Sequence, residues 1–510
     1  MEQTNASSGD TIKKISLFGA PILSLLFILF FDLSPGHPEI TYTAAIAFLM
    51  AVWWITETIP LAVTALIPLI LFPTFGVMDG KAVSTQYVNH IIFIFIGGFM
   101  VALAMERWNL HKRIALRILM LVGVHPRFIL LGFMLATALL SMWISNTATT
   151  MMMIPIAIAI ISKLDEMLGE ETVRKFAVGI FLGIAYSASV GGIATLIGTP
   201  PNLVFARIFN TTFPKAPEIS FAKWFFFAFP ISIVFLFIVW MLLDLIFSPR
   251  KEITLDKEVF SDQFKALGPI TFEEKVVLVD FLLLVLLWMF RADIEIGNFT
   301  IPGWSGFFPK AGFINDGTVS IGMAFILFLV PTGKPGRRGR ILDWKTASTL
   351  PWNIVLLFGG GFALAAGFKN SGLSSWLGKH MEALGTLPPL LIIACVCLFI
   401  TFLTELTSNT ATAQILLPIL AALAVSIKVN PLLLMIPGTL SCSFAFMLPV
   451  ATPPNAIVFG TGRLRVSDMT RVGVILNLLG VIMITAAVYL VGKGVFGIDL
   501  SALPAWMVGP

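Results

Sequence analysis

Charged residues and cysteines are scarce in this chain. Asp, Glu, Lys and Arg make up 12% of its 510 residues, against about 25% in a typical soluble domain. The three cysteines, Cys395, Cys397 and Cys442, lie inside apolar runs without metal-ligand or disulfide spacing, so we interpret them as packing residues. The apolar runs also lack a nucleophile beside a base and a cluster of metal ligands. These absences argue against an enzyme.

Hydrophobic residues are abundant instead. They make up 57% of the chain, and the mean hydropathy is +0.94. Apolar stretches near 20 residues recur along the whole length, which indicates an all-α polytopic membrane protein surrounded by lipid. The first 14 residues are polar and lack a cleavage site, so we expect a cytoplasmic tail followed by a retained helix. The net charge of +5 does not require a nucleic-acid partner, because membrane proteins hold Lys and Arg in cytoplasmic loops.

The apolar pattern predicts about eleven transmembrane segments and two further runs that are too long for one crossing. The segments lie at about 15–33, 40–57, 59–75, 91–106, 176–207, 224–247, 276–291, 317–331, 351–368, 432–459 and 472–494. The long runs lie at about 127–162 and 388–425, and each has the pentapeptide SNTAT near its middle. We expect re-entrant hairpins there, because polar irregular backbone at this depth must be buried in protein or line a cavity.

The loop charges predict an orientation in the plasma (inner) membrane. With the N-terminus in the cytoplasm and the hairpins not crossing, most of the 33 Lys and Arg residues fall in cytoplasmic loops, as the positive-inside rule requires. The C-terminus then lies outside the cell.

Three sequence patterns occur twice in the same order. IFIGGFMVALAM at 94–105 is similar to LFGGGFALAAGF at 357–368, SNTAT occurs at 145–149 and 408–412, and TPPN at 199–202 and 452–455. In the predicted topology the two copies run in opposite directions. Inverted repeats are typical of secondary transporters with a site near the bilayer midplane. A channel is the alternative, which blocked hairpins and inverted repeats disfavour.

The duplicated motifs contain residues that suit helix ends. Ser, Asn and Thr at a hairpin tip can cap the returning half-helix, whose positive N-terminal end favours a carboxylate. In each TPPN, the Thr stands as a cap and the first Pro at the first helical position, and the carbonyls just upstream are freed for a cation. The predicted substrate-binding residues are Ser145, Asn146, Thr147, Thr199, Pro200, Ser408, Asn409, Thr410, Thr452 and Pro453.

No Lys or Arg lies in either hairpin core or beside TPPN, so we expect sodium ions to neutralise the anion. Na⁺ suits oxygen ligands, by analogy with other hard cations. Ser141 and Thr404 each lie four residues before a tip serine, on the same helix face. Two intramembrane acids stand near the motifs: we expect Glu405 to tune the site or to pack between helices, and Glu57 to be structural.

These motifs, together with WWITETIPLAVTALIPLILFP at 53–73 and INDGTVSIGMAFILFLVP at 314–331, resemble the divalent anion/sodium symporter family, the INDY-type carboxylate carriers. The resemblance covers the chain from about residue 15. It implies a homodimer that works by an elevator mechanism, without an organic cofactor. It also implies a scaffold at 15–122 and 276–385 and a moving transport domain at 127–247 and 388–497, with a cytoplasmic loop at 248–275.

The resemblance further implies two sodium sites and a substrate class. The first site maps to Ser141, Ser145, Asn146 and Gly198, and the second to Thr404, Ser408, Asn409 and Ala451. TPPN in both repeats is similar to bacterial members, which favours sodium-coupled uptake of C4-dicarboxylates such as succinate, malate and fumarate. Sodium-independent dicarboxylate exchange is the alternative on the same scaffold, and sulfate or a tricarboxylate is a third substrate option.

Overall fold

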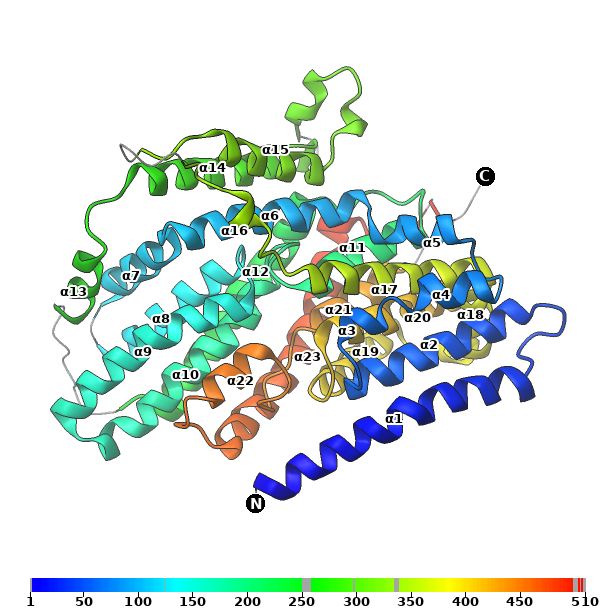
Figure 1. Cartoon of the computed structure of the whole chain (residues 1–510), viewed down its shortest axis with the longest axis horizontal. Coiled ribbons are helices and arrows are strands. Elements are labelled where there is room, and N and C mark those ends of the chain that lie inside the picture. The colour runs from blue at the N-terminus through cyan, green and yellow to red at the C-terminus, as the bar shows by residue number, and fades with distance from the viewer. Residues whose placement is uncertain are drawn as a thin grey trace.

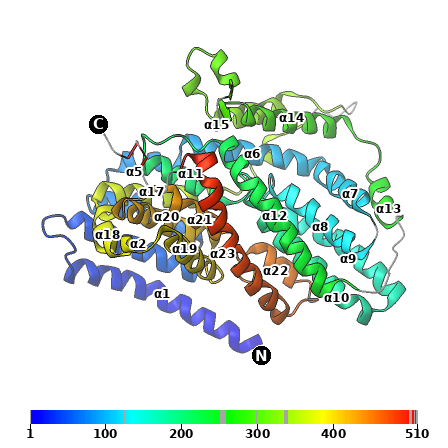
Figure 2. The same cartoon turned by 180° about the vertical axis from the view of Figure 1, so that it is seen from behind.

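The protein is an almost entirely helical molecule in which two helical groups flank a central set of broken helices (Figures 1 and 2). A computed structural model describes residues 2–123, 125–249, 258–296, 299–333, 339–498, 503, 504, 506 and 507. In Figure 1, α7–α10, α12 and α22 form one group, and α1–α4 with α17–α20 form the other.

The helices of the first half follow the apolar runs. They are α1 (Glu2–Phe30), α2 (Pro38–Thr56), α3 (Leu61–Thr64), α4 (Ile67–Thr74), α5 (Gly80–Tyr87), α6 (His90–Arg107), α7 (Leu110–Val122), α8 (Pro126–Ser141), α9 (Asn146–Leu168), α10 (Glu170–Gly192), α11 (Pro200–Thr212), α12 (Phe221–Phe247) and α13 (Glu258–Ala266).

The second half begins with α14, which is followed by a small irregular region and then by further helices. Its elements are α14 (Phe272–Met289), β1 (Ile294–Ile296), β2 (Phe299–Ile301), η1 (Trp304–Phe307), η2 (Ala311–Phe313), α15 (Asp316–Leu329), α16 (Trp344–Ala347), α17 (Trp352–Ser371), α18 (Leu373–Met381), η3 (Glu382–Thr386), α19 (Pro389–Thr404), α20 (Asn409–Ser426), α21 (Leu432–Ser441), α22 (Pro453–Phe459) and α23 (Val466–Phe496).

Fewer helices are long enough to cross a bilayer than the eleven segments predicted. Among the described residues, nine helices pass by length and composition, or ten if Leu373–Thr386 and Pro389–Thr404, bent by 120°, count as one broken span. Several predicted segments are shorter or broken. The segment predicted at 59–75 divides into α3 and α4, where Pro68 stands in the first turn of α4 and cannot donate to a continuing helix.

Each SNTAT lies at a break between two helices, as its polarity predicts. The first tip joins α8 to α9, with Ser145 at the N-cap of α9. The second joins α19 to α20, with Ser408 at the N-cap of α20. Each TPPN also begins a new helix, α11 or α22. Figures 1 and 2 show these breaks near the middle of the molecule.

The GGF glycines allow close helix packing. A methyl group at Gly97 would lie 2.4 Å from Cβ of Ser320 on α15, and one at Gly360 would lie 2.5 Å from the carbonyl oxygen of Ala65. Both distances are below any normal carbon contact, so these helices pack backbone to backbone. The duplicated motif is therefore explained by packing.

Segments predicted as a tail and as loops contain secondary structure. Residues 2–14, expected as a tail, form the beginning of α1. The segment 248–275, predicted as a cytoplasmic loop, contains α13, and the loop at 292–316 contains the paired strands β1 and β2. Cys397 and Cys442 are buried as predicted, but Cys395 is exposed and lines an apolar pocket with Leu384 and Phe399.

Candidate substrate and cation site

The first hairpin tip is capped by its serine. Ser145 has extended backbone (φ −57°, ψ 142°), and its Oγ accepts a hydrogen bond from the backbone N–H of Ala148 at 3.2 Å. This bond satisfies one of the N–H groups that the start of a helix leaves without an internal partner. The side chain of Thr147 has no partner in the described protein and lines a cavity beside the tip. Its hydroxyl is therefore available to a ligand.

Four oxygen-bearing groups converge beneath this tip. Ser141 Oγ lies 2.5 Å from Asn146 Oδ1 and 2.8 Å from the carbonyl oxygen of Ala188. The position of Asn146 Oδ1 also lies 3.1 Å from the carbonyl oxygen of Ala188 and 3.3 Å from that of Gly198. The Ser141 hydroxyl has one proton and can donate to only one of these oxygens. The other contacts are satisfied by an amide turned to donate through its nitrogen or by a bound cation. The cluster contains three of the four predicted ligands, and Ala188 is an addition that no motif marked.

A similar but smaller cluster lies beneath the second tip. Thr404 Oγ1 lies 2.8 Å from Asn409 Oδ1 and 3.0 Å from the carbonyl oxygen of Cys442. Ala451, predicted as a ligand here, lines the cavity, and the carbonyl in contact with Thr404 is that of Cys442. Of the three residues expected to be able to cap this half-helix, Ser408 stands at the N-cap, and its side chain makes no capping bond. That hydroxyl is left free on the cavity wall.

The threonines of the two TPPN motifs also differ, because only one of them caps its helix. Thr452 Oγ1 accepts from the backbone N–H of Asn455 at 3.2 Å, so it caps α22. Thr199 makes no capping bond at α11, contrary to prediction, and its hydroxyl is free. Pro200 and Pro453 are the first residues of these two helices, as predicted.

The side chain of the asparagine in each TPPN donates hydrogen bonds to backbone carbonyls of the irregular segment that precedes it. Asn202 Nδ2 donates to the carbonyl oxygen of Thr195 at 2.7 Å and lies 3.3 Å from those of Gly192 and Ile193. Asn455 Nδ2 donates to the carbonyl oxygens of Ala445 and Leu448 at 3.1 and 3.0 Å. Both side chains are fully buried. They take over carbonyls that an unbroken helix would have satisfied, a role that sequence reasoning missed.

Glu405 ties the second hairpin tip to the loop before α22. Its carboxylate accepts from the backbone N–H groups of Phe446 and Met447 at 2.7 and 2.9 Å, and from that of Leu448 at 3.1 Å. Asn477 Nδ2 on α23 donates to it at 2.7 Å. Of the two roles considered, the structure shows a packing and positioning role. Glu405 fixes the irregular loop whose far end carries Thr452.

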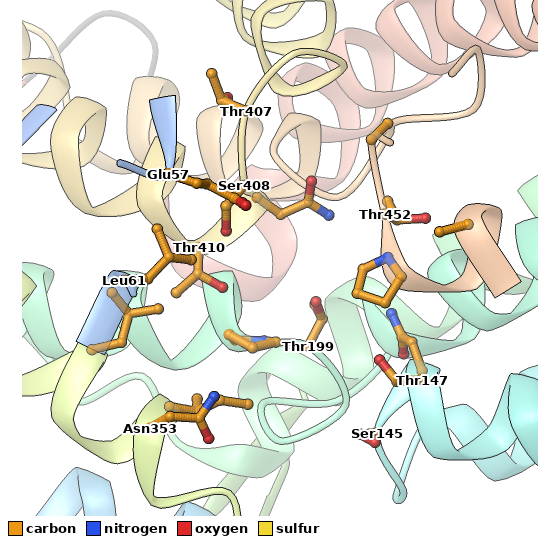
Figure 3. Close-up of a pocket in the computed structure, with 18 of the residues that line it drawn as sticks. Glu57, Leu61, Ser145, Thr147, Thr199, Asn353, Thr407, Ser408, Thr410 and Thr452 are labelled. Carbon is orange, nitrogen blue, oxygen red and sulfur yellow. The ribbon is translucent and has the colours of Figure 1, made fainter. Parts of the chain in front are cut away.

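The two tips and the two TPPN breaks surround one cavity of about 660 Å³ (Figure 3). It is lined by Ser145, Asn146, Thr147, Gly198, Thr199, Pro200, Ser408, Asn409, Thr410, Ala451, Thr452 and Pro453. Ser141 and Thr404 lie fully buried below the lining. Thus twelve of the fourteen residues predicted for substrate or cations share one cavity, although they come from segments 300 residues apart.

Sequence reasoning missed the opposite wall. In Figure 3, Glu57, Leu61 and Asn353 lie on the side of the cavity away from Ser145, Thr147 and Thr452. Of the described residues that line it, only Lys13 and Glu57 carry a charge. Glu57, interpreted from the sequence as structural, is exposed there in a left-handed conformation (φ 46°). Lys13 lies with Lys14 at the start of the first apolar run, where a lysine pair looks like ordinary flanking residues.

Comparison with known proteins agrees with this architecture. The family profile described as the sodium:sulfate symporter transmembrane region matches residues 13–498. The sodium-dependent dicarboxylate transporter SdcS of Staphylococcus saprophyticus is 43% identical over 493 residues, which cover 96% of this chain and 93% of that protein. The SdcS protein of Staphylococcus aureus strain bovine RF122 / ET3-1 is also 43% identical, over 498 residues covering 96% and 92%.

A solved structure supports the fold. The Alcanivorax borkumensis YdaH transporter, whose crystal structure is described as revealing an unusual topology, aligns with a TM-score of 0.52 at 14% identity, over 83% of this chain and 89% of that one. At this identity the likeness concerns the fold alone. The family profile and the relatives cover almost the whole chain and confirm the resemblance seen in the motifs: the protein belongs to the sodium:sulfate (divalent anion/sodium) symporter family and is a multi-pass membrane transporter, not an enzyme.

Proposed function

We propose that this protein carries C4-dicarboxylates such as succinate, malate and fumarate into the cell together with sodium ions. Its relatives at 43% identity are called sodium-dependent dicarboxylate transporters. The observation that carries the proposal is a cavity bordered by four helix N-termini and two buried oxygen clusters. A doubly negative solute and hard cations are the ligands that such surroundings favour.

The anion would lie between the two hairpin tips. The free hydroxyls of Thr147, Thr199, Ser408 and Thr410 line the cavity and can donate to carboxylate oxygens. The positive ends of α9 and α20 begin at Asn146 and Asn409. These partial charges fall off within a turn, so the anion must come close to be held.

The cations would occupy the two oxygen clusters. Ser141, Ser145, Asn146 and Gly198 form the proposed first site, with Ala188 added, and Thr404, Ser408, Asn409 and Ala451 the second, with Cys442 added. Both clusters lie directly beneath the half-helix ends that would hold the anion. Bound sodium would therefore supply the positive field that no Lys or Arg at the tips provides, which couples the two binding events.

We further propose an elevator mechanism in a homodimer, in which 127–247 and 388–497 move against a scaffold of 15–122 and 276–385. The cavity wall supports this division, because the tips and TPPN motifs belong to the first set and Glu57, Leu61 and Asn353 to the second. Intersubunit crosslinking and paired cysteines across this boundary would test the dimer and the movement.

The deciding experiment measures labelled succinate uptake into liposomes that contain the purified protein. We expect uptake that follows an inward sodium gradient without internal substrate. Uptake that needs internal succinate and ignores sodium would instead identify the exchanger. Competition by sulfate and citrate would decide the substrate class.

Two substitutions test the site itself. We expect Asn146→Ala and Asn409→Ala to abolish uptake, because each removes an amide from an oxygen cluster. The stabilisation of purified protein by NaCl over KCl at equal ionic strength should also shrink, which reports on cation binding without transport. Normal uptake by both variants would show that the site is wrongly assigned.

A further inference from the structure

The cavity reaches the first half of α1 and the end of α2, and we take this side as its opening. The first two candidate spans, Thr11–Phe30 and Pro38–Thr56, run in opposite directions. The start of the first and the end of the second therefore lie at one face. Lys13 and Glu57, at these two positions, both line the cavity. By the predicted topology this face is cytoplasmic.

Lys13 is held beside this opening by the packing of α1 on α2. Trp53 Nε1 donates to the carbonyl oxygen of Ser16, one helical turn from Lys13, at 3.0 Å. Among the ion pairs of the described residues, none includes Lys13 or Glu57. Lys13 and its neighbour Lys14 are both exposed, but only Lys13 lines the cavity. Among the described residues, the ammonium of Lys13 therefore has no ion-pair partner, and Glu57 is the other charged residue on the same lining.

In the described lining, Lys13 and Glu57 carry the full charges that act at a distance on an approaching anion, and Lys13 is the one that attracts it. The helix ends at the tips are effective within about one turn, and the rest of the described lining is neutral apart from Glu57. A full charge in an aqueous opening is felt over roughly one Debye length, about 8–10 Å at physiological ionic strength. It attracts a dianion twice as strongly as a monoanion.

We propose that Lys13 is a substrate-attracting residue of the cytoplasmic opening, which raises the local concentration of the dicarboxylate there. This inference rests on the proposed function. Glu57 acts in the opposite sense on the anion and favours the accompanying cation. Because Lys13 lies at one face only, its main effect is on the half-saturating substrate concentration measured from that face.

The test compares Lys13→Gln with wild type in inside-out and right-side-out membrane vesicles. Initial rates of labelled succinate uptake are measured at fixed sodium and low ionic strength. We expect KM to rise roughly two- to sixfold in inside-out vesicles and less in right-side-out vesicles, as Coulomb attraction of a dianion at about one Debye length predicts. Added potassium chloride should reduce this difference. Lys13→Arg should restore the wild-type KM, and Glu57→Gln should lower it.

Lys14→Gln is the matched control, because it removes the same charge one residue away from the lining. An unchanged KM for Lys13→Gln, an equal change in both vesicle orientations, or an equal effect of Lys14→Gln would each overturn the proposal. A fall in maximal rate alone would also contradict it. The wild-type vesicles report separately on the proposed function: absence of succinate uptake there refutes that function, whereas wild-type behaviour of Lys13→Gln refutes only the role of Lys13.

Discussion

Gly192, the last residue of α10, lies directly against the amide of Asn146. A methyl group at this position would stand 2.6 Å from Asn146 Oδ1 and 3.2 Å from its Cγ. The backbone of Gly192 accepts from Asn202 and is fully packed, so the helix cannot simply retreat. Gly192→Ala should therefore push the Asn146 side chain away from Ser141 and from the carbonyls of Ala188 and Gly198.

The size of the effect follows from overpacking. Forcing an extra carbon into a packed site typically costs about 1–3 kcal/mol, and the alanine regains roughly 0.5–1 kcal/mol of helix stability. The strain here falls on the oxygen cluster, so it should appear as weaker sodium binding. A loss of about 1–3 kcal/mol corresponds to roughly 5- to 150-fold in affinity.

The assay is the sodium dependence of succinate uptake in proteoliposomes, with the melting temperature of the purified protein as a check on folding. We expect a rise in the half-saturating sodium concentration with little change in melting temperature. Gly183→Ala, on the same helix, is the control, because its methyl group would meet only the flexible ends of Leu130 and Met134, at 2.9 and 3.1 Å. Unaltered sodium dependence in Gly192→Ala would refute the assignment of this cluster to a cation.

Two further predictions concern the threonines of the TPPN motifs and the loop that Glu405 holds. Thr452→Ala should lower stability by about 0.5–2 kcal/mol through the lost cap, whereas Thr199→Ala should raise the KM for substrate with an unchanged melting temperature. Equal melting temperatures for both variants would contradict the observed caps. Glu405→Gln should lower the melting temperature and transport together, because a charged acceptor contributes about 1.5–3 kcal/mol and an amide NH₂ would face backbone N–H donors. The loss should exceed that of Asn477→Ala, which removes one donor, and an equal or smaller loss would show that the loop does not depend on the carboxylate.

Much of this molecule could be predicted from local patterns. Apolar runs identify most helices, because the length needed to cross a bilayer is long enough to stand out in a sequence. SNTAT and TPPN identify the breaks, since polar residues and prolines within such runs have few structural explanations. The count of crossings was less accurate, because Pro68 and similar residues break apolar runs into helices too short to span. The expected helix caps form at Ser145 and Thr452 and not at Ser408 and Thr199. Both copies of each motif have a residue that can cap a helix, and only the surrounding structure decides which copy bonds to the backbone.

The sequence by itself therefore determined the class of the protein, the presence of two related halves and the residues at their breaks. These properties depend on neighbours along the chain. The tertiary structure alone decided that Ala188 and Cys442 supply carbonyls, that Glu405 fixes the loop before Thr452, and that Lys13 and Glu57 stand at the opening of the cavity. Such contacts join residues far apart in sequence through the packing of whole helices, and packing leaves no short pattern from which they could be read.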